Sequence, residues 1–174
     1  MFRFLKSIKA RDPAARNYLQ IILFYPGVKA IFWYRVARIF YVIKLKIIAE
    51  AIMYFVRMFQ GIEIHPGAKI GKGLFIDHGL GIVIGETAII GDNCTMYHGS
   101  TLGGTGKEHS KRHPTLKNNV IIGAGAKVLG NIEIGNNVKI GANAVVTFNV
   151  SDNKTVIGQK ATIHTKISDL DYYI

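Results

Sequence analysis

The most constraining feature of this chain is an aliphatic residue that returns every six positions and is usually followed by glycine. The pattern starts at Ile64 and recurs in the pairs Ile70-Gly71, Ile84-Gly85, Ile90-Gly91, Leu102-Gly103, Ile122-Gly123, Ile134-Gly135, Ile140-Gly141 and Ile157-Gly158. This period matches neither a helical turn nor the simple alternation of a strand, and it is typical of a solenoid built from hexapeptides. We therefore predict a left-handed parallel β-helix over residues 61–167, because a β-sandwich would show irregular strand spacing.

A second marker of each hexad is a small residue four positions after the aliphatic one. These small residues are Ala68, Ala88, Cys94, Ser100, Ala126 and Ala144. We expect both markers to point into a narrow interior, while Gly, Asn and Asp at the corners accept tight or left-handed backbone. Cys94 is thus predicted to be a buried structural thiol rather than a nucleophile. A lone cysteine forms no disulfide within the chain, which favours a reducing, cytoplasmic location.

Residues 1–60 have a different composition and predict a separate α-helical region. Charged residues, proline and glycine interrupt its two apolar stretches, 18–34 and 39–59, whereas a membrane span needs about 20 consecutive apolar residues. Packed amphipathic helices are therefore expected, with no secretory signal and no membrane association. Eleven Lys and Arg face only Asp12 and Glu50 here, so the net charge of +11 is mostly N-terminal. No nucleic-acid motif accompanies this charge, so we expect a solvated basic face and no nucleic-acid partner.

Three interruptions of the repeat are the candidate functional segments, since loops that leave a regular scaffold often carry function. They span residues 77–83, 103–121 and 151–156. The first contains Asp77-His78, and a neutral imidazole there can take a proton from a hydroxyl if a carboxylate orients it. Glu63 lies fifteen residues earlier, about one coil away, and is the candidate carboxylate. On these residues alone, an exposed histidine without catalytic function is an open alternative.

The long loop, residues 103–121, has the length to reach a neighbouring subunit. Its Arg112 can hold a carboxylate through the planar guanidinium. His109 and His113 are four residues apart, a spacing that suits a metal on a helix. Because they lie in a loop, we expect no metal site.

Several motifs in these segments occur together. They are RDPA at 11–14, GIEIHPGAKIG at 61–71, FIDHGLGIVIGET at 75–87, TLGGTGK at 101–107, RHP at 112–114 and IGAGAKVLG at 122–130. The combination closely resembles the serine O-acetyltransferases, whereas other hexapeptide acyltransferases share only the repeat and often a histidine. The resemblance implies acetyl transfer from acetyl-CoA to the hydroxyl of L-serine, which gives O-acetyl-L-serine for cysteine biosynthesis.

The resemblance also assigns roles to residues of this chain. His78 would be the general base and Glu63 its carboxylate partner, at a position where many members have Asp. The residues that would bind the amino acid are Asp12, Asp77, Arg112 and His113. Those that would line the acetyl-CoA groove between subunits are Gly104, Ala124 and Ala142.

The resemblance further implies partners. These are a homotrimer, or a dimer of trimers as formed by members with a larger helical region, and L-cysteine as feedback inhibitor. In the tail at 168–174, the C-terminal Ile174 would enter the active site of O-acetylserine sulfhydrylase; the alternative is a frayed end. The competing function is a sugar or xenobiotic O-acetyltransferase, which should lack Asp12, Asp77 and Arg112. A γ-class carbonic anhydrase requires three zinc histidines at a spacing that is not found here.

Overall fold

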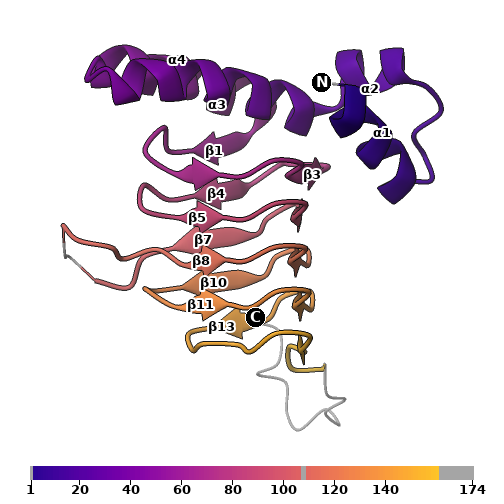
Figure 1. The fold of residues 1–174 in the computed structure, drawn as a ribbon, viewed down its shortest axis with the longest axis vertical. Coiled ribbons are helices and arrows are strands. Elements are labelled where there is room, and N and C mark those ends of the chain that lie inside the picture. The colour runs from indigo at the N-terminus through magenta and orange to yellow at the C-terminus, as the bar shows by residue number, and fades with distance from the viewer. Residues whose placement is uncertain (1, 107–108, 161–174) are drawn as a thin grey trace, which may run out of the picture.

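The computed structural model describes residues 2–106 and 109–160, which form a helical cap and a tall parallel β-helix (Figure 1). The cap consists of α1 (Phe2–Arg11), α2 (Tyr18–Phe24), α3 (Pro26–Val42) and α4 (Lys46–Gln60). Helices α3 and α4 lie across one end of the solenoid, and α1 and α2 lie to one side of it. Helix α4 ends at Gln60, and the first strand of the solenoid, β1, begins at Ile62.

The solenoid has three faces, and every strand pairs in parallel with strands one coil away. Sheet A contains β1 (Ile62–Ile64), β4 (Ile82–Ile84), β7 (Thr101–Gly103), β10 (Lys127–Leu129) and β13 (Val145–Val146). Sheet B contains β2 (Lys69–Ile70), β5 (Ile89–Ile90), β8 (Thr115–Leu116) and β11 (Glu133–Ile134). Sheet C contains β3 (Phe75–Asp77), β6 (Thr95–Tyr97), β9 (Ile121–Ile122), β12 (Lys139–Ile140) and β14 (Thr155–Val156). The predicted parallel β-helix is confirmed.

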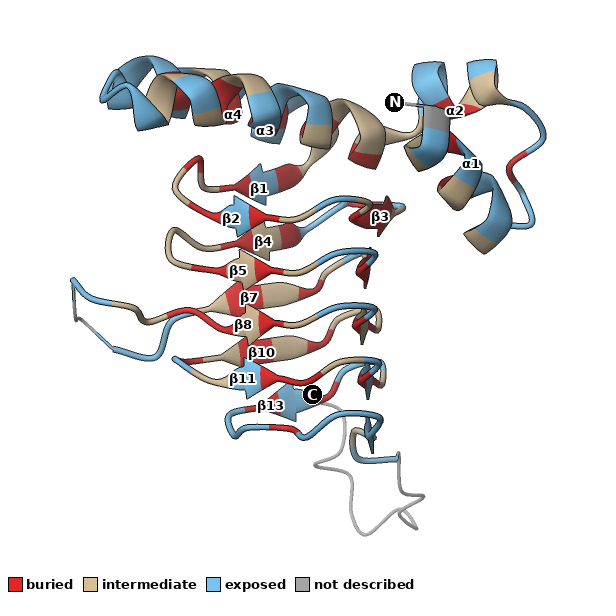
Figure 2. Ribbon diagram, in the orientation of Figure 1, coloured by how far each residue is buried: buried red, intermediate tan, exposed pale blue. Residues whose placement is uncertain are grey.

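The interior is filled by the two residue classes that the hexad predicts, and Figure 2 shows the buried positions on successive strands. The aliphatic positions from Ile64 to Val146 and the small residues, Cys94 among them, are all buried. Leu116 is also buried, so the repeat resumes at β8 and the long loop occupies only residues 104–114. The prediction for Ile157 is wrong, because Val156 pairs with Ile140 and Ile157 is 74% exposed. The next predicted position, Ile163, lies outside the described residues.

The corners explain why the chain can turn every six residues. At the edge between sheets B and C, five successive coils turn through a left-handed residue. These residues are Gly73, Asn93, Asn119, Asn137 and Asn153. Asparagine side chains also bond one another along this edge, as from Asn119 to Asn137 at 3.0 Å. Asparagine tolerates this backbone, and the side-chain bonds from Asn119 to Asn137 and from Asn137 to Asn153 form a ladder across three of these coils.

Arginine and tyrosine side chains attach the helical cap to the solenoid. Tyr34 donates a hydrogen bond to the Ala68 carbonyl at 2.6 Å, and Arg38 donates to the Pro66 and Gly67 carbonyls. Arg11 reaches the Gly73 and Cys94 carbonyls in the same way. Part of the N-terminal positive charge therefore caps backbone carbonyls instead of forming the solvated face expected from composition.

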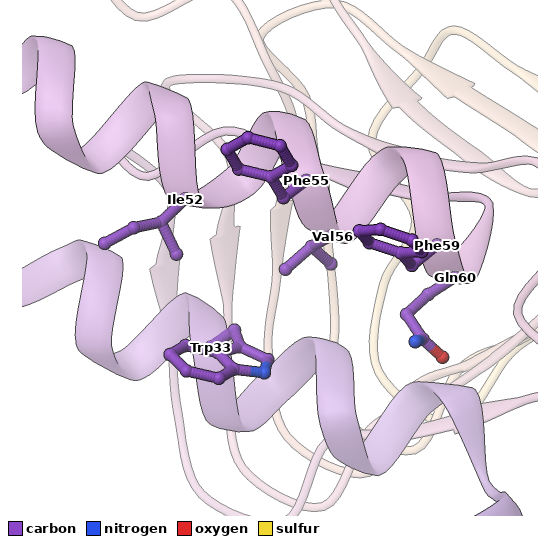
Figure 3. A pocket seen from close by; sticks show the side chains of 6 residues that line it. All are labelled: Trp33, Ile52, Phe55, Val56, Phe59 and Gln60. Carbon is purple, nitrogen blue, oxygen red and sulfur yellow. The ribbon is translucent and has the colours of Figure 1, made fainter.

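The other side of the cap is apolar and exposed. Trp33 of α3 lies opposite Phe55, Val56 and Phe59 of α4, and these side chains line an open groove (Figure 3). Large hydrophobic residues elsewhere on α2, α3 and α4 are also exposed. None of the helices described is long and apolar enough to cross a membrane.

Candidate active site

Most of the predicted site residues lie along the two edges of sheet A. At the C–A edge, where the chain passes from sheet C to sheet A, the corners contain His78, Ala124 and Ala142. At the A–B edge, where it passes from sheet A to sheet B, the long loop contributes Gly104 and Arg112. The repeat thus stacks residues that are distant in sequence along two parallel lines.

His78 occupies a left-handed corner directly after β3. Its φ of 59° is uncommon for a residue with a side chain, and the corner directs the ring outward, where it is exposed. The His98 ring, one coil further on, meets it edge to face with 5.7 Å between the ring centroids. The sequence gives no role to His98, and the structure places it directly beside the candidate base.

Two carboxylates converge near this edge through Tyr25. The Tyr25 hydroxyl donates a hydrogen bond to Asp12. Burial, this bond and the negative charges of Asp12 and Asp77 together raise the pKa of Tyr25 to about 12. Asp77 ends β3 immediately before His78, so the structure brings Asp12, Asp77 and the candidate base into one region. Sequence reasoning missed Tyr25, whose one signal is its place just before Pro26, the first residue of α3.

The C–A edge also presents a smooth strip of backbone. A side chain at Gly81 would lie 3.5 Å from the Gly99 Cα, and one at Gly99 would lie 3.5 Å from the Gly125 Cα. Lys127 stabilises this strip, because its Nζ donates to the Gly99 and Gly125 carbonyls at 2.6 and 2.9 Å. Gly81, Gly99 and Gly125, with Ala124 and Ala142 at adjacent corners, thus line this edge with backbone and small side chains, beside the exposed side chains of Leu80 and His98.

The A–B edge contains a cluster around Arg112. Its guanidinium forms an ion pair with Glu86 at 2.7 Å, and this bond is the main reason why the pKa of Glu86 lies below its usual value. The Tyr41 hydroxyl also donates to Glu86 at 3.3 Å. A side chain at Gly104 would contact Arg112 at 3.3 Å, so the predicted Gly104 and Arg112 are neighbours. Sequence reasoning quoted the Gly-Glu-Thr motif but assigned no role to its Glu86.

His113 is buried at the same edge, with 8% of its surface exposed. Its Nδ1 lies 2.9 Å from the Thr87 hydroxyl and 3.2 Å from the Thr87 backbone nitrogen. Burial and the nearby Arg112 and Lys111 lower the pKa of His113, and burial likewise lowers that of His65. Both rings therefore favour the neutral form.

Glu63 lies on the outer surface of β1, opposite Val83. Its carboxylate forms an ion pair with Arg57 at 3.1 Å, and both side chains are about half exposed, at 55% for Arg57 and 49% for Glu63. Such a surface pair contributes little stability, so Glu63 is available to other partners. Its pairing with His78 stays a prediction. Across residues 2–106 and 109–160, no group of three or more His, Cys, Asp or Glu side chains is arranged to hold a metal ion.

Comparisons with known proteins identify the family of the chain. Residues 113–147 match the family described as bacterial transferase hexapeptide (six repeats). A serine acetyltransferase of Synechococcus elongatus is 58% identical over 85% of this chain, and one of Helicobacter pylori is 56% identical over 93%. The chain belongs to the serine acetyltransferase family. It spans 61% of the Synechococcus member's length and 95% of the Helicobacter member's.

Solved structures of the family share the fold. Neisseria gonorrhoeae serine acetyltransferase in complex with serine superposes with a TM-score of 0.86 at 42% identity, over 91% of this chain and 65% of that one. Serine acetyltransferase isoform 3 of Entamoeba histolytica in complex with cysteine gives 0.88 at 43% identity, over 97% of this chain and 60% of that one. The family therefore extends over both the helical cap and the solenoid.

Proposed function

We propose that this chain is a serine O-acetyltransferase that transfers acetyl directly from acetyl-CoA to L-serine. The observation that supports this best is the placement of complementary groups along sheet A. The C–A edge offers a base, His78, with the carboxylates Asp12 and Asp77 nearby, and the A–B edge offers the Arg112 guanidinium. Two carboxylates suit the ammonium of an amino acid, and a guanidinium suits its carboxylate. A neutral sugar would need neither.

In the mechanism that we propose, His78 takes the proton of the serine hydroxyl as its oxygen attacks the thioester carbon. Hydrogen-bond donors in the groove stabilise the tetrahedral oxyanion. Collapse of the intermediate breaks the carbon–sulfur bond, and the imidazolium returns the proton to the CoA thiolate. Glu63 would orient the imidazole. Cys94 takes no part, because it is fully buried and burial raises its pKa to about 11.

The test is an assay of CoA release. Release should require L-serine, should not occur with galactosides, and should need no added zinc. His78→Ala should remove most of the activity while the fold is retained, as checked by circular dichroism and thermal unfolding. His109→Ala, which removes another histidine, should retain activity. Near-normal turnover by His78→Ala would exclude this mechanism, and acetylation of galactosides instead of serine would favour the competing function.

We also propose that the enzyme is a homotrimer whose sites lie between subunits. The two edges of sheet A are separated by strands of up to three residues, which span about 10 Å, farther than one serine molecule reaches. A threefold ring of identical contacts would bring the C–A edge of one subunit to the A–B edge of the next.

Subunit mixing tests this assembly. His78→Ala and Arg112→Ala subunits, each inactive alone, should recover activity when they are unfolded and refolded together. Random assembly restores about a quarter of the interfaces, because each complete site takes its two halves from different subunits. Recovery of no activity from mixed trimers would place both halves of the site in one subunit.

The exposed apolar groove of Figure 3 supports the pairing of two trimers through their caps. Replacing Trp33 and Phe55 by serine should then convert a hexamer to a trimer, as measured by light scattering. If the unmodified protein is already a trimer, this part of the proposal fails.

The single buried cysteine supports a cytoplasmic location.

L-cysteine is the proposed feedback inhibitor, because it presents the same ammonium and carboxylate as serine. The cysteine complex of the Entamoeba enzyme supports this. Inhibition should be competitive with serine, and Asp12→Asn should weaken the binding of both amino acids. Inhibition that serine does not relieve would argue against a shared site.

The predicted complex with O-acetylserine sulfhydrylase depends on Ile174, which lies outside the described residues. A peptide of the last residues, titrated against the sulfhydrylase, should bind. A peptide that lacks the terminal isoleucine is the control, and equal behaviour of the two would exclude the role of Ile174.

A further inference from the structure

Thr87 makes an unusual number of hydrogen bonds at the point where the long loop rejoins the solenoid. Its hydroxyl oxygen lies 3.0 Å from the Arg112 backbone nitrogen, 3.1 Å from that of His113 and 2.9 Å from the His113 Nδ1. Its own backbone nitrogen lies 3.2 Å from the same Nδ1. One threonine therefore contacts both the backbone and the ring of the loop's two candidate binding residues.

The donors and acceptors in this cluster can be assigned by counting. A hydroxyl has two lone pairs and one proton. The backbone N–H groups of Arg112 and His113 can only donate, and together they occupy both lone pairs. The Thr87 proton must then point to Nδ1, and the Thr87 N–H points to Nδ1 as well. Nδ1 is thus an acceptor, so the proton of a neutral His113 ring is on Nε2.

The surroundings of the ring favour this neutral form. The charged and titratable groups that act on it are Arg112 and Lys111 of the loop, Glu86 before Thr87, and His65 one coil away, and only Glu86 favours protonation. Among the described residues, the hydrogen bonds of the ring are at Nδ1, and no buried side-chain nitrogen or oxygen lacks a partner. Nε2, which lies beside Gly85, is therefore the ring nitrogen left to donate to a ligand.

We propose that Thr87 is a positioning residue that holds His113 as a neutral imidazole protonated on Nε2, so that the ring presents one N–H donor of fixed direction to the substrate carboxylate beside Arg112. This proposal rests on the serine-binding role proposed above for His113. Its consequence is that the site recognises the carboxylate with one permanent cation and one neutral donor. As long as the ring is neutral, the direction of its Nε2–H donor does not change with pH.

Nitrogen NMR of the ¹⁵N-histidine-labelled protein tests the tautomer without any assay of activity. The His113 signals are assigned by their loss in His113→Gln. In the unmodified protein and in Thr87→Ser, Nδ1 should appear unprotonated and Nε2 protonated. In Thr87→Val, which keeps the shape and the backbone N–H but loses the hydroxyl bond, the Nδ1 signal should shift and the tautomer protonated on Nδ1 should become populated. A ring protonated on Nδ1 in the unmodified protein, or a Thr87→Val spectrum identical to it, would overturn the proposal.

Kinetics then test whether the positioning matters for binding. Thr87→Val should raise the KM for serine about tenfold or more and leave the KM for acetyl-CoA within about twofold. Thr87→Ser should restore the serine KM, and Thr155→Val, the same change at an exposed threonine of β14, should have no effect. An equal loss for both substrates with a lowered Tm would indicate a merely structural role and contradict the proposal. If the protein does not acetylate serine at all, the proposed function fails, whereas the tautomer result stands by itself.

Discussion

Replacing Gly85 by alanine is a sharp test of the A–B edge, because a methyl group there would collide with His113. A Cβ on Gly85 would lie 2.0 Å from both the Cδ2 and the Nε2 of the ring. The backbone itself accepts alanine, since the φ of Gly85 lies outside the left-handed region. The substitution therefore acts on the ring rather than on the turn.

The size of the effect follows from this geometry. Ordinary contacts between heavy atoms need about 3.5 Å, so the ring must move by roughly 1.5 Å. A shift of this size breaks the bonds from Thr87 to Nδ1, which are 2.9 and 3.2 Å long and weaken steeply when stretched. A displacement of about 1 Å in a binding group reduces rates by about 10²-fold, or roughly 2.7 kcal/mol of transition-state stabilisation.

The assay is kcat/KM for serine, measured by CoA release in Gly85→Ala, His113→Ala and the double variant. If the methyl group acts only through the ring, Gly85→Ala should reduce kcat/KM about 10²-fold alone and very little in the His113→Ala background. Thermal unfolding of each variant checks that the fold persists. A Gly85→Ala enzyme within threefold of normal, or full additivity of the two changes, would refute the reasoning.

The other predictions concern stability and the thiol. Gly27→Ala should lower the free energy of unfolding by about 1–3 kcal/mol in urea titrations, since its Cβ would lie 2.4 Å from the Ile76 carbonyl oxygen; a gain of about 1 kcal/mol, as in a free helix, would contradict this contact. Cys94→Ala should destabilise the fold by about 1 kcal/mol and leave kcat unchanged, and loss of turnover in a folded variant would give the thiol a role. The free energy of unfolding should decrease as the pH falls below about 6.5, because the pKa values of His65 and His113 are lowered in the folded protein. The unfolded chain therefore takes up protons at a higher pH than the folded one. A free energy of unfolding that does not change with pH in urea titrations would disprove this prediction.

The hexad pattern predicted the solenoid well because each coil places the same local requirements on its residues. An aliphatic residue such as Ile90 must be buried, and a corner residue such as Asn93 must accept left-handed backbone, in every turn. The prediction failed at Ile157, because the last coil is two residues shorter than the one before it: Val156 pairs with Ile140, 16 residues earlier, whereas Ile140 pairs with Ile122, 18 residues earlier. The prediction also missed that the repeat resumes at Leu116, because the long loop interrupts the six-residue spacing before it.

The candidate site was less predictable, since its contacts join residues that no local rule connects. Family motifs pointed to His78, Asp12 and Arg112. They did not indicate that Tyr25 holds Asp12, or that Glu86 pairs with Arg112. Neither motif nor charge predicted that Arg57 is the partner of Glu63.

The sequence alone determined the architecture of this protein and the family to which it belongs, because a period of six and a set of motifs can be read along the chain. Only the tertiary structure decided how the candidate site residues are arranged. The coils stack His78 with Ala124 and Ala142 on one edge of sheet A, and Arg112 with His113 on the other. That division depends on the registration of parallel strands in three dimensions. It is the physical reason for expecting a site shared between subunits.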